Sequence, residues 1–256
     1  MDPIIILRTG STAEPVQREY GDYDRWFIDA MRHHDLRFAV YDITRSPLPE
    51  MTRCLGIIVT GATSAAYRHE PWMDALHRFL RRAERIGPPV LCVCLSAQLL
   101  AQARGGDVVL NPAGWEIGAV RLNLTEQGRA DPLFEGLAEE ITVMATHEDR
   151  IQRLAPEAAL LASNGAAPVQ AFRAAARVWG VQFHPELTAG ALRLLIELRR
   201  DSLMADVERH GQQDPGRHVD RLLEGLSERD EAAGRRILDN FVKVCRREDA
   251  TIAAGV

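Results

Sequence analysis

Cys94 stands at the end of an apolar run, at the point where a helix-like stretch begins. The run covers residues 89–93, and the stretch that follows covers residues 95–103. A nucleophile at a sharp strand-to-helix turn is presented at the edge of the sheet, toward solvent. The helix N-terminus behind it favours negative charge, and therefore favours a thiolate over a thiol. The sequence thus predicts a reactive thiol at Cys94.

A second apolar run, residues 178–183, leads to a candidate general base. His184 follows this run directly, and Glu186 lies two residues further on. A thiol, a base and a carboxylate that orients the base are the parts of a nucleophilic triad. We therefore expect Cys94, His184 and Glu186 to act together in acyl transfer.

Each of these residues also has a plain structural interpretation. A cysteine at the end of a core strand more often packs than reacts, and a histidine before a proline is often a loop residue. Here both residues occur in one chain, and each ends a strand-like run. This combination favours catalysis over packing.

The two segments resemble those of a known family. Residues 89–106 are similar to the nucleophile segment of class I glutamine amidotransferases, and residues 181–186, Val-Gln-Phe-His-Pro-Glu, resemble their His-Pro-Glu segment. The resemblance extends from about Ile4 to about Arg199, and residues 238–241 are also similar. It implies that Cys94 attacks the γ-amide of glutamine or of a related γ-glutamyl compound. A γ-glutamyl thioester would form and water would hydrolyse it.

The resemblance also implies a site for the oxyanion and for the substrate. The oxyanion donors would be the backbone N–H groups of Leu95, which follows the nucleophile, and of Gly61, in a turn after the third strand. A glycine lets the backbone approach a substrate closely, although a simple turn glycine is the alternative. Gln98 is similar to the family residue that helps to hold the substrate glutamine.

Several positions depart from the family pattern. Cys92 and Ser96 replace the glycines two residues before and after the nucleophile, and Ala97 replaces a histidine or methionine. Because these residues are small, we expect the turn to be kept with some strain. Residues 146–149, Thr-His-Glu-Asp, replace a Ser-His-Gly-Asp loop.

Within that loop, His147 and Glu148 join Gln98 as predicted substrate-binding residues. Glu148 replaces a glycine whose backbone normally faces the substrate. Two like charges about 4 Å apart repel by roughly 4 kcal/mol at an effective dielectric near 20. We therefore expect weak use of free glutamine, and better use of a γ-glutamyl compound whose α-carboxylate is masked or whose amine pairs with Glu148. For His147, an exposed loop histidine is the alternative.

Residues 19–24 and 64–72 resemble free-standing, GMP-synthase-like members of the family, which carry no synthetase domain. The sequence contains no P-loop and no ATP-pyrophosphatase motif. Any ammonia would therefore go to a separate synthetase or acceptor-enzyme partner, or be released. Two alternatives stay open: a γ-glutamyl peptidase that acts alone, and a degenerate, non-catalytic glutaminase-like binding subunit.

Composition and charge argue against several other kinds of function. The 256 residues are 46% hydrophobic and 26% charged, which is ordinary for a soluble globular protein. A formal charge of −5 gives no footprint for nucleic acid or for an anionic membrane. We expect no cofactor, and a reduced cytoplasm is the expected location, since the cysteines are few and show no metal-ligand spacing. The four are Cys54, Cys92, Cys94 and Cys245.

Apolar strands that alternate with helices predict an α/β fold with three layers: a mostly parallel central sheet with helices on both faces. Shorter strand-like pieces from 107 to 172 indicate a small antiparallel extension. After Thr188, an expected N-cap, helices are predicted up to Arg247, with a polar break at 210–216. We expect a class I glutamine amidotransferase-like domain over 1–200 and a C-terminal helical extension over 201–256, packed on the same domain. The expected strands are 3–7, 37–41, 56–59, 90–93, 108–110, 118–122, 141–144, 159–161, 168–172 and 178–183, and the first expected helices are 22–34, 71–86 and 95–103.

Overall fold

A computed structural model describes residues 2–49, 54–211 and 213–254 of the chain. Its main feature is a nine-stranded sheet with the strand order β2-β1-β3-β4-β11-β10-β9-β6-β7. A separate two-stranded sheet pairs β5 with β8. The strands are β1 (Ile4–Arg8), β2 (Phe38–Asp42), β3 (Gly56–Val59), β4 (Val90–Val93), β5 (Asp107–Leu110), β6 (Glu116–Leu124), β7 (Glu140–His147), β8 (Asp149–Arg153), β9 (Ala159–Ser163), β10 (Ala171–Ala175) and β11 (Val178–Val181).

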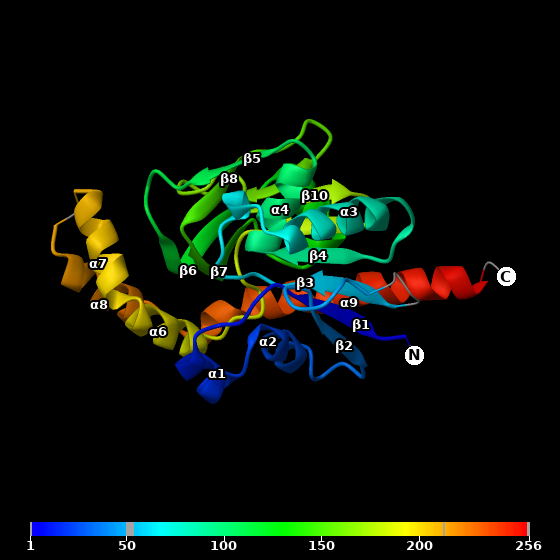
Figure 1. Cartoon of the computed structure of the whole chain (residues 1–256), viewed down its shortest axis with the longest axis horizontal. Helices are drawn as coiled ribbons and strands as arrows, with labels where there is room; N and C mark the ends of the chain where they lie inside the picture. The colour runs from blue at the N-terminus through cyan, green and yellow to red at the C-terminus, as the bar shows by residue number, and fades with distance from the viewer. Residues whose placement is uncertain (1, 50–53, 212, 255–256) are drawn as a thin grey trace.

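Helices cover both faces of this sheet (Figure 1). They are α1 (Glu14–Tyr20), α2 (Tyr23–Ala30), α3 (Pro71–Ile86), α4 (Leu95–Ala103), α5 (Glu126–Ala130), α6 (Ala189–Leu198), α7 (Arg200–Arg209), α8 (Pro215–Glu224) and α9 (Ala232–Ala254). One buried cluster joins α2 and α9 to one face, and a second joins α3 and α4 to the other. The predicted three-layer α/β fold is therefore confirmed.

The five strands β2, β1, β3, β4 and β11 form the parallel half of the sheet. Strands β3, β4 and β11 are buried at every position, as expected for parallel strands covered on both faces. Since parallel strands end at one edge, the residues that follow β3, β4 and β11 meet there. This edge carries the candidate catalytic residues.

The predicted small antiparallel part is present as the β5–β8 sheet, and the main sheet also has an antiparallel half. Strands β10, β9, β6 and β7 continue the main sheet in antiparallel pairs, and β6 pairs with β7 from Glu116 to Asn123. The strand expected at 168–172 begins only at Ala171. Three elements, α1, α5 and β8, were not predicted, because each is short and lacks a clear apolar period.

The C-terminal helix α9 belongs to the core rather than to the surface. Ile237, Leu238 and Phe241 are fully buried against the sheet. At Gly234, an added Cβ would lie 2.5 Å from the carbonyl oxygen of Pro185, so the helix backbone packs directly on the His-Pro-Glu segment. In Figure 1, α9 runs along the length of the sheet, while α7 and α8 lie at the end of the molecule opposite the C-terminus.

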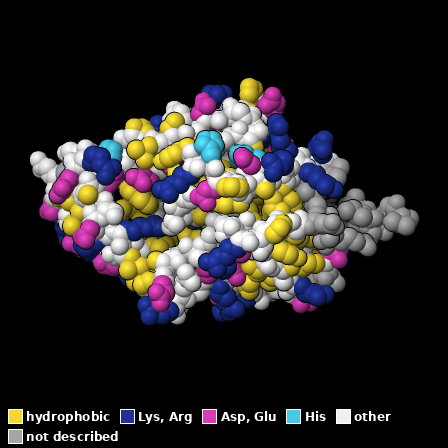
Figure 2. Space-filling view, in the orientation of Figure 1, with side chains coloured by type: hydrophobic (Ala, Val, Ile, Leu, Met, Phe, Trp, Pro, Cys, Tyr) yellow, Lys and Arg dark blue, Asp and Glu magenta, His cyan; other side chains and the backbone are white. Residues whose placement is uncertain are grey.

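The surface is mixed in charge. In Figure 2, basic and acidic side chains are interspersed over the visible face. Many of them form local pairs, such as Arg25 with Asp29 and Arg200 with Glu197. Within the described part of the chain, none of the helices is long and apolar enough to span a membrane.

Candidate active site

Cys94 occupies a strained turn between β4 and α4. Its backbone angles are φ 52° and ψ −110°, a left-handed φ that costs a non-glycine residue free energy and is typically retained where function requires it. The Cys94 N–H donates to the carbonyl oxygen of Val181 at 2.8 Å, which ties the turn to the end of β11. Only 6% of the residue is exposed, and that part faces a cavity.

The two substitutions around the nucleophile leave the turn intact. The Ser96 hydroxyl is fully buried, accepts a hydrogen bond from the Val93 N–H at 2.7 Å and lies 2.7 Å from the Val59 carbonyl oxygen, to which it donates. The hydroxyl therefore links the turn to β3, a contact that the glycine of the family pattern could not make.

Cys92 is buried in the cluster under α3 and α4, and this burial raises the pKa of its thiol. Cys94 belongs to the opposite cluster, so the elbow turns it away from Cys92.

His184 and Glu186 form the second part of the constellation. The Nδ1 atom of His184 lies 2.7 Å from Oε1 of Glu186, and both side chains are almost fully buried. The backbone N–H of His184 donates to the carbonyl oxygen of Met144 at 2.8 Å, which fixes the segment against β7. Cys94 is close enough to the same imidazole ring to raise its pKa, and both side chains line one cavity.

Charge inside the site favours a protonated imidazole. Burial of the ring opposes the charge, but Glu186 and Cys94 outweigh it and raise the pKa of His184 to about 10. An imidazolium beside a thiol is the arrangement that favours a thiolate nucleophile. The three predicted triad residues therefore lie together, in the order thiol, imidazole, carboxylate.

Gly61 packs directly against the side chains of Cys94 and His184. A Cβ atom built on it would lie 3.0 Å from Cε1 of His184 and 3.1 Å from Cβ of Cys94. Its carbonyl oxygen accepts hydrogen bonds from the Thr9 and Thr60 hydroxyls at 2.8 and 3.0 Å, which fixes the orientation of the turn. Leu95 is the first residue of α4, and the first N–H groups of a helix have no partner within the helix.

A cavity of about 300 Å³ opens beside Cys94. Six of the eight predicted site residues line it: Cys94, Leu95, Gln98, His147, Glu148 and His184. Of the other two, Gly61 packs against Cys94 and His184, and Glu186 is hydrogen-bonded to His184. All eight predicted residues therefore lie at one site.

Gln98 lines the cavity, and its amide nitrogen is bound by other protein groups. Its Nε2 donates to Oε1 of Gln182 and to the carbonyl oxygen of Asp149, both at 3.2 Å. Gln182 in turn directs its Nε2 toward the sulfur of Cys94, at 3.7 Å. Gln98 thus positions Gln182, a residue that the sequence pattern marks only as part of the His-Pro-Glu segment.

His147 and Glu148 differ in their surroundings. His147 is buried, with Nε2 2.9 Å from Oε2 of Glu116 and Nδ1 2.9 Å from the carbonyl oxygen of Asp149. Each ring nitrogen therefore lies 2.9 Å from an oxygen atom of the protein. Glu148 is partly exposed on the cavity wall. The pKa of Asp149 is raised mainly by its own burial and further by the negative charge of Glu148.

Arg199 is a cavity residue that the sequence did not single out. Its guanidinium lies over the ring of Trp115, 5.2 Å from the centroid, and Nη1 donates to the Thr146 hydroxyl at 2.5 Å. Among the described residues, no carboxylate forms an ion pair with it. Burial lowers the pKa of Arg199, although Tyr23 and Cys94 oppose this effect. The cavity therefore contains a cation without an anionic partner from the described chain.

The comparisons with known proteins agree with this site. The model of the glutamine amidotransferase class-I family matches residues 18–196. The chain belongs to the class I glutamine amidotransferase family. It is thus a glutamine amidotransferase-type protein in fold and in the order of its motifs.

Two curated relatives carry different functional names. One of them, a subunit of the glutamine-hydrolysing GMP synthase of Archaeoglobus fulgidus, is 27% identical over 169 residues, which cover 66% of this chain and 85% of that one. The gamma-glutamyl-L-1-hydroxyisopropylamide hydrolase of a Pseudomonas species is 28% identical over 191 residues, or 71% of this chain and 63% of that one. The match to the GMP synthase of Aeropyrum pernix covers only 25% of that protein's length.

A solved structure supports the fold along the whole chain. The glutamine amidotransferase of Methylobacillus flagellatus superposes with a TM-score of 0.76 at 24% identity, over 95% of each chain.

Proposed function

We propose that this protein is a cysteine-dependent amidohydrolase that cleaves the γ-amide of glutamine or of a related γ-glutamyl compound. The observation that carries the proposal is the convergence of Cys94, at a strained strand-to-helix turn, with the hydrogen-bonded pair of His184 and Glu186. A thiol nucleophile with free cysteines elsewhere suits a reducing compartment such as the cytoplasm.

The proposed reaction has two halves. The Cys94 thiolate attacks the γ-carbonyl carbon, and the oxyanion that forms is stabilised by the N–H groups of Leu95 and Gly61. The imidazolium of His184 donates its proton to the leaving nitrogen, the C–N bond breaks and ammonia or an amine departs. His184 then takes a proton from water, which attacks the thioester and releases glutamate and the thiolate. Glu186 keeps the imidazole in the orientation that both steps need.

Charge in the cavity suggests how the substrate is held. Arg199 is a cation without a carboxylate partner among the described residues, and Glu148 and Asp149 form an acidic wall. An α-amino acid group carries one charge of each sign. We propose that Arg199 binds the α-carboxylate of the substrate and that Glu148 binds its α-ammonium group. His147 holds the acidic wall in place through Asp149, and Gln98 holds Gln182 in place.

A second candidate is a γ-glutamyl amide hydrolase or peptidase that needs no partner enzyme. The similarity to the Pseudomonas hydrolase named for a γ-glutamyl amide favours it, as does Glu148 at a position where the family has glycine. In the first candidate, as in a GMP synthase built from separate subunits, a synthetase partner would receive the ammonia. A non-catalytic binding subunit is the third alternative.

The test combines labelling with a substrate panel. A glutamine analogue that alkylates thiols should label Cys94 in the wild type, and Cys94→Ala should lose both the label and all amide hydrolysis while melting as the wild type does. Cys54→Ser, at a half-buried cysteine outside the site, is the matched control and should keep both. Release of ammonia from glutamine and of amine from γ-glutamyl amides would then rank the two enzymatic candidates. Hydrolysis that survives in Cys94→Ala would overturn the proposal.

A further inference from the structure

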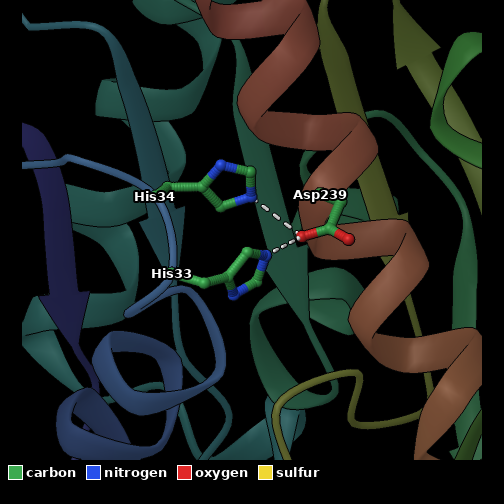
Figure 3. Close-up of side chains that lie close together, drawn as sticks. All are labelled: His33, His34 and Asp239. Atoms are coloured by element: carbon green, nitrogen blue, oxygen red, sulfur yellow. Dashed lines mark hydrogen bonds and ion pairs between the residues drawn. The ribbon is translucent and has the colours of Figure 1, made fainter.

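Two histidines and an aspartate converge on one point between the turn after α2 and the helix α9. The Nε2 atoms of His33 and of His34 each lie 2.8 Å from the same oxygen, Oδ1 of Asp239. The two imidazole rings lie side by side, with centroids 4.2 Å apart (Figure 3). One ligand atom from each of the three residues falls within 4.8 Å of the others.

We propose that His33, His34 and Asp239 bind a divalent transition-metal ion of the zinc type. Imidazole nitrogen and carboxylate oxygen are ligands that zinc uses, at about 2.0–2.2 Å. In a tetrahedral site, such bond lengths separate two ligand atoms by roughly 3.3 Å. The observed separations of 2.8 Å would need to widen only slightly for an ion to enter between the nitrogens and the oxygen.

The exposure of the three side chains suits an ion that keeps water. His33 is 54% exposed, Asp239 28% and His34 16%. Three protein ligands with one solvent-facing side leave a coordination position for water, unlike the closed four-ligand sites of purely structural zinc. The ligand chemistry, with two imidazoles, favours zinc, nickel or copper over magnesium or calcium, which prefer oxygen.

Most of the positive charge in the groove beside the cluster is paired with carboxylates. The groove beside the cluster is lined by His33 and Asp239 together with several arginines. Of the three arginines, Arg25 pairs with Asp29 and Arg235 pairs with Glu231, which leaves Arg32 as the one that no described carboxylate neutralises.

The ion would connect distant parts of the chain. His33 and His34 lie in the turn after α2, and Asp239 lies on α9, 205 residues beyond His34. The helix α9 also packs on Pro185, and Glu231 accepts a hydrogen bond from the Ala189 N–H. A metal cross-link here would therefore hold α9, and with it the His-Pro-Glu segment, against the N-terminal part of the fold. Sequence spacing gave no sign of this site, since Asp239 lies 205 residues beyond His34.

The experiment must separate this site from the candidate active site, because a thiolate and an imidazole are also ligand types for zinc. We would use the full chain without a histidine tag, in a Cys94→Ala background and freed of metal by a chelator. Zinc retained after gel filtration should be one ion per chain. A hundredfold excess over the dissociation constant should raise the melting temperature by about 5 °C or more. Cobalt(II) should give the absorption bands of a low-symmetry, imidazole-containing site.

Two variants and one control test the ligands. His33→Gln, at an exposed position, and Asp239→Asn, which keeps the side-chain size, should each lower the zinc affinity at least tenfold and abolish the metal-dependent rise in melting temperature. Their melting temperatures in chelator report whether the fold is intact. His69→Ala, at an exposed histidine outside the cluster, should bind zinc as the background does. Absence of retained zinc, or binding that both variants leave unchanged, would overturn the proposal.

Discussion

Cys94 and His184 follow two parallel strands that are hydrogen-bonded to each other, whereas Arg199 and Glu148 come from a helix end and from a turn between β7 and β8. The first pair is positioned by buried β4 and β11, whose register sets Val93 beside Val181. The second pair depends on side-chain contacts such as that of Arg199 with Thr146. The proposed reacting groups are thus tied to the core, and the residues proposed to select a substrate lie on parts that tolerate change.

Removal of the base should give the largest effect within this comparison. His184→Ala should lower kcat by about 10²–10⁴-fold, because a general base typically contributes that much. Glu186→Gln should lower kcat less, since it removes only the charge that orients His184 and favours its protonated form. Steady-state kinetics with the preferred substrate measures both. If Glu186→Gln matched the wild type, Glu186 would be no more than a structural partner of His184.

The same pair predicts a dependence of stability on pH. The pKa of His184 is raised from 6.5 to about 10 in the folded protein, so its protonated form stabilises the fold. That contribution is fully present below about pH 6.5 and is lost as the pH rises through about 10. The wild type should therefore lose more stability than Glu186→Gln between pH 7 and pH 10. Parallel losses in chemical denaturation of the two proteins would contradict this assignment.

The next effect concerns the close approach of Gly61. In Gly61→Ala, the new methyl group would lie 3.0 Å from His184 and 3.1 Å from Cys94, so one of them must move. A misplacement of about 1 Å can cost about 10²-fold. Since the shift needed here is smaller, we expect kcat to fall by roughly 10-fold, with KM less affected. Gly165→Ala is the matched control, because no atom lies within 4 Å of the position that its Cβ would take. Equal kinetics for both variants would remove Gly61 from the proposed oxyanion site.

The features that the sequence predicted and those that it missed differ in the same way as these two pairs of residues. Apolar runs that end at Cys94 and His184 gave the parallel strands and the triad residues, because burial on both faces leaves a clear pattern. Arg199 and the cluster around Asp239 gave no pattern, since a single charged residue on a helix usually faces solvent. Their roles depend on which distant side chains they meet, such as Trp115 and His34. The substrate-binding roles of His147 and Glu148 stay predictions.

Arg199 provides the sharpest test of how the substrate is proposed to bind. Arg199→Met should raise KM for glutamine by about tenfold or more, because hydrogen bonds to charged groups contribute about 1.5–3 kcal/mol. The wild type should lose a similar factor with a substrate whose α-carboxylate is a carboxamide, and the two losses should not add. Arg200→Met is the matched control, since Arg200 pairs with Glu197 and Asp220 outside the cavity. Additive losses would show that Arg199 does not contact the α-carboxylate, while the triad assignment would stand.

Glu148 should give the smallest effect, because it is partly exposed and solvent screens its charge. Considered alone, it would repel the α-carboxylate of glutamine, and Glu148→Gly would then raise kcat/KM. With Arg199 available for the carboxylate, we expect the opposite: Glu148→Gln should lower kcat/KM by a few fold for substrates with a free α-ammonium. Substrates with an acetylated α-nitrogen should show no such loss, because they carry no charge for Glu148 to pair. The comparison of these two substrates in wild type and Glu148→Gln separates attraction from repulsion. A rise in kcat/KM for the free amine would mean that Glu148 acts against free glutamine, and that substrate choice in this protein rests on exclusion rather than on pairing.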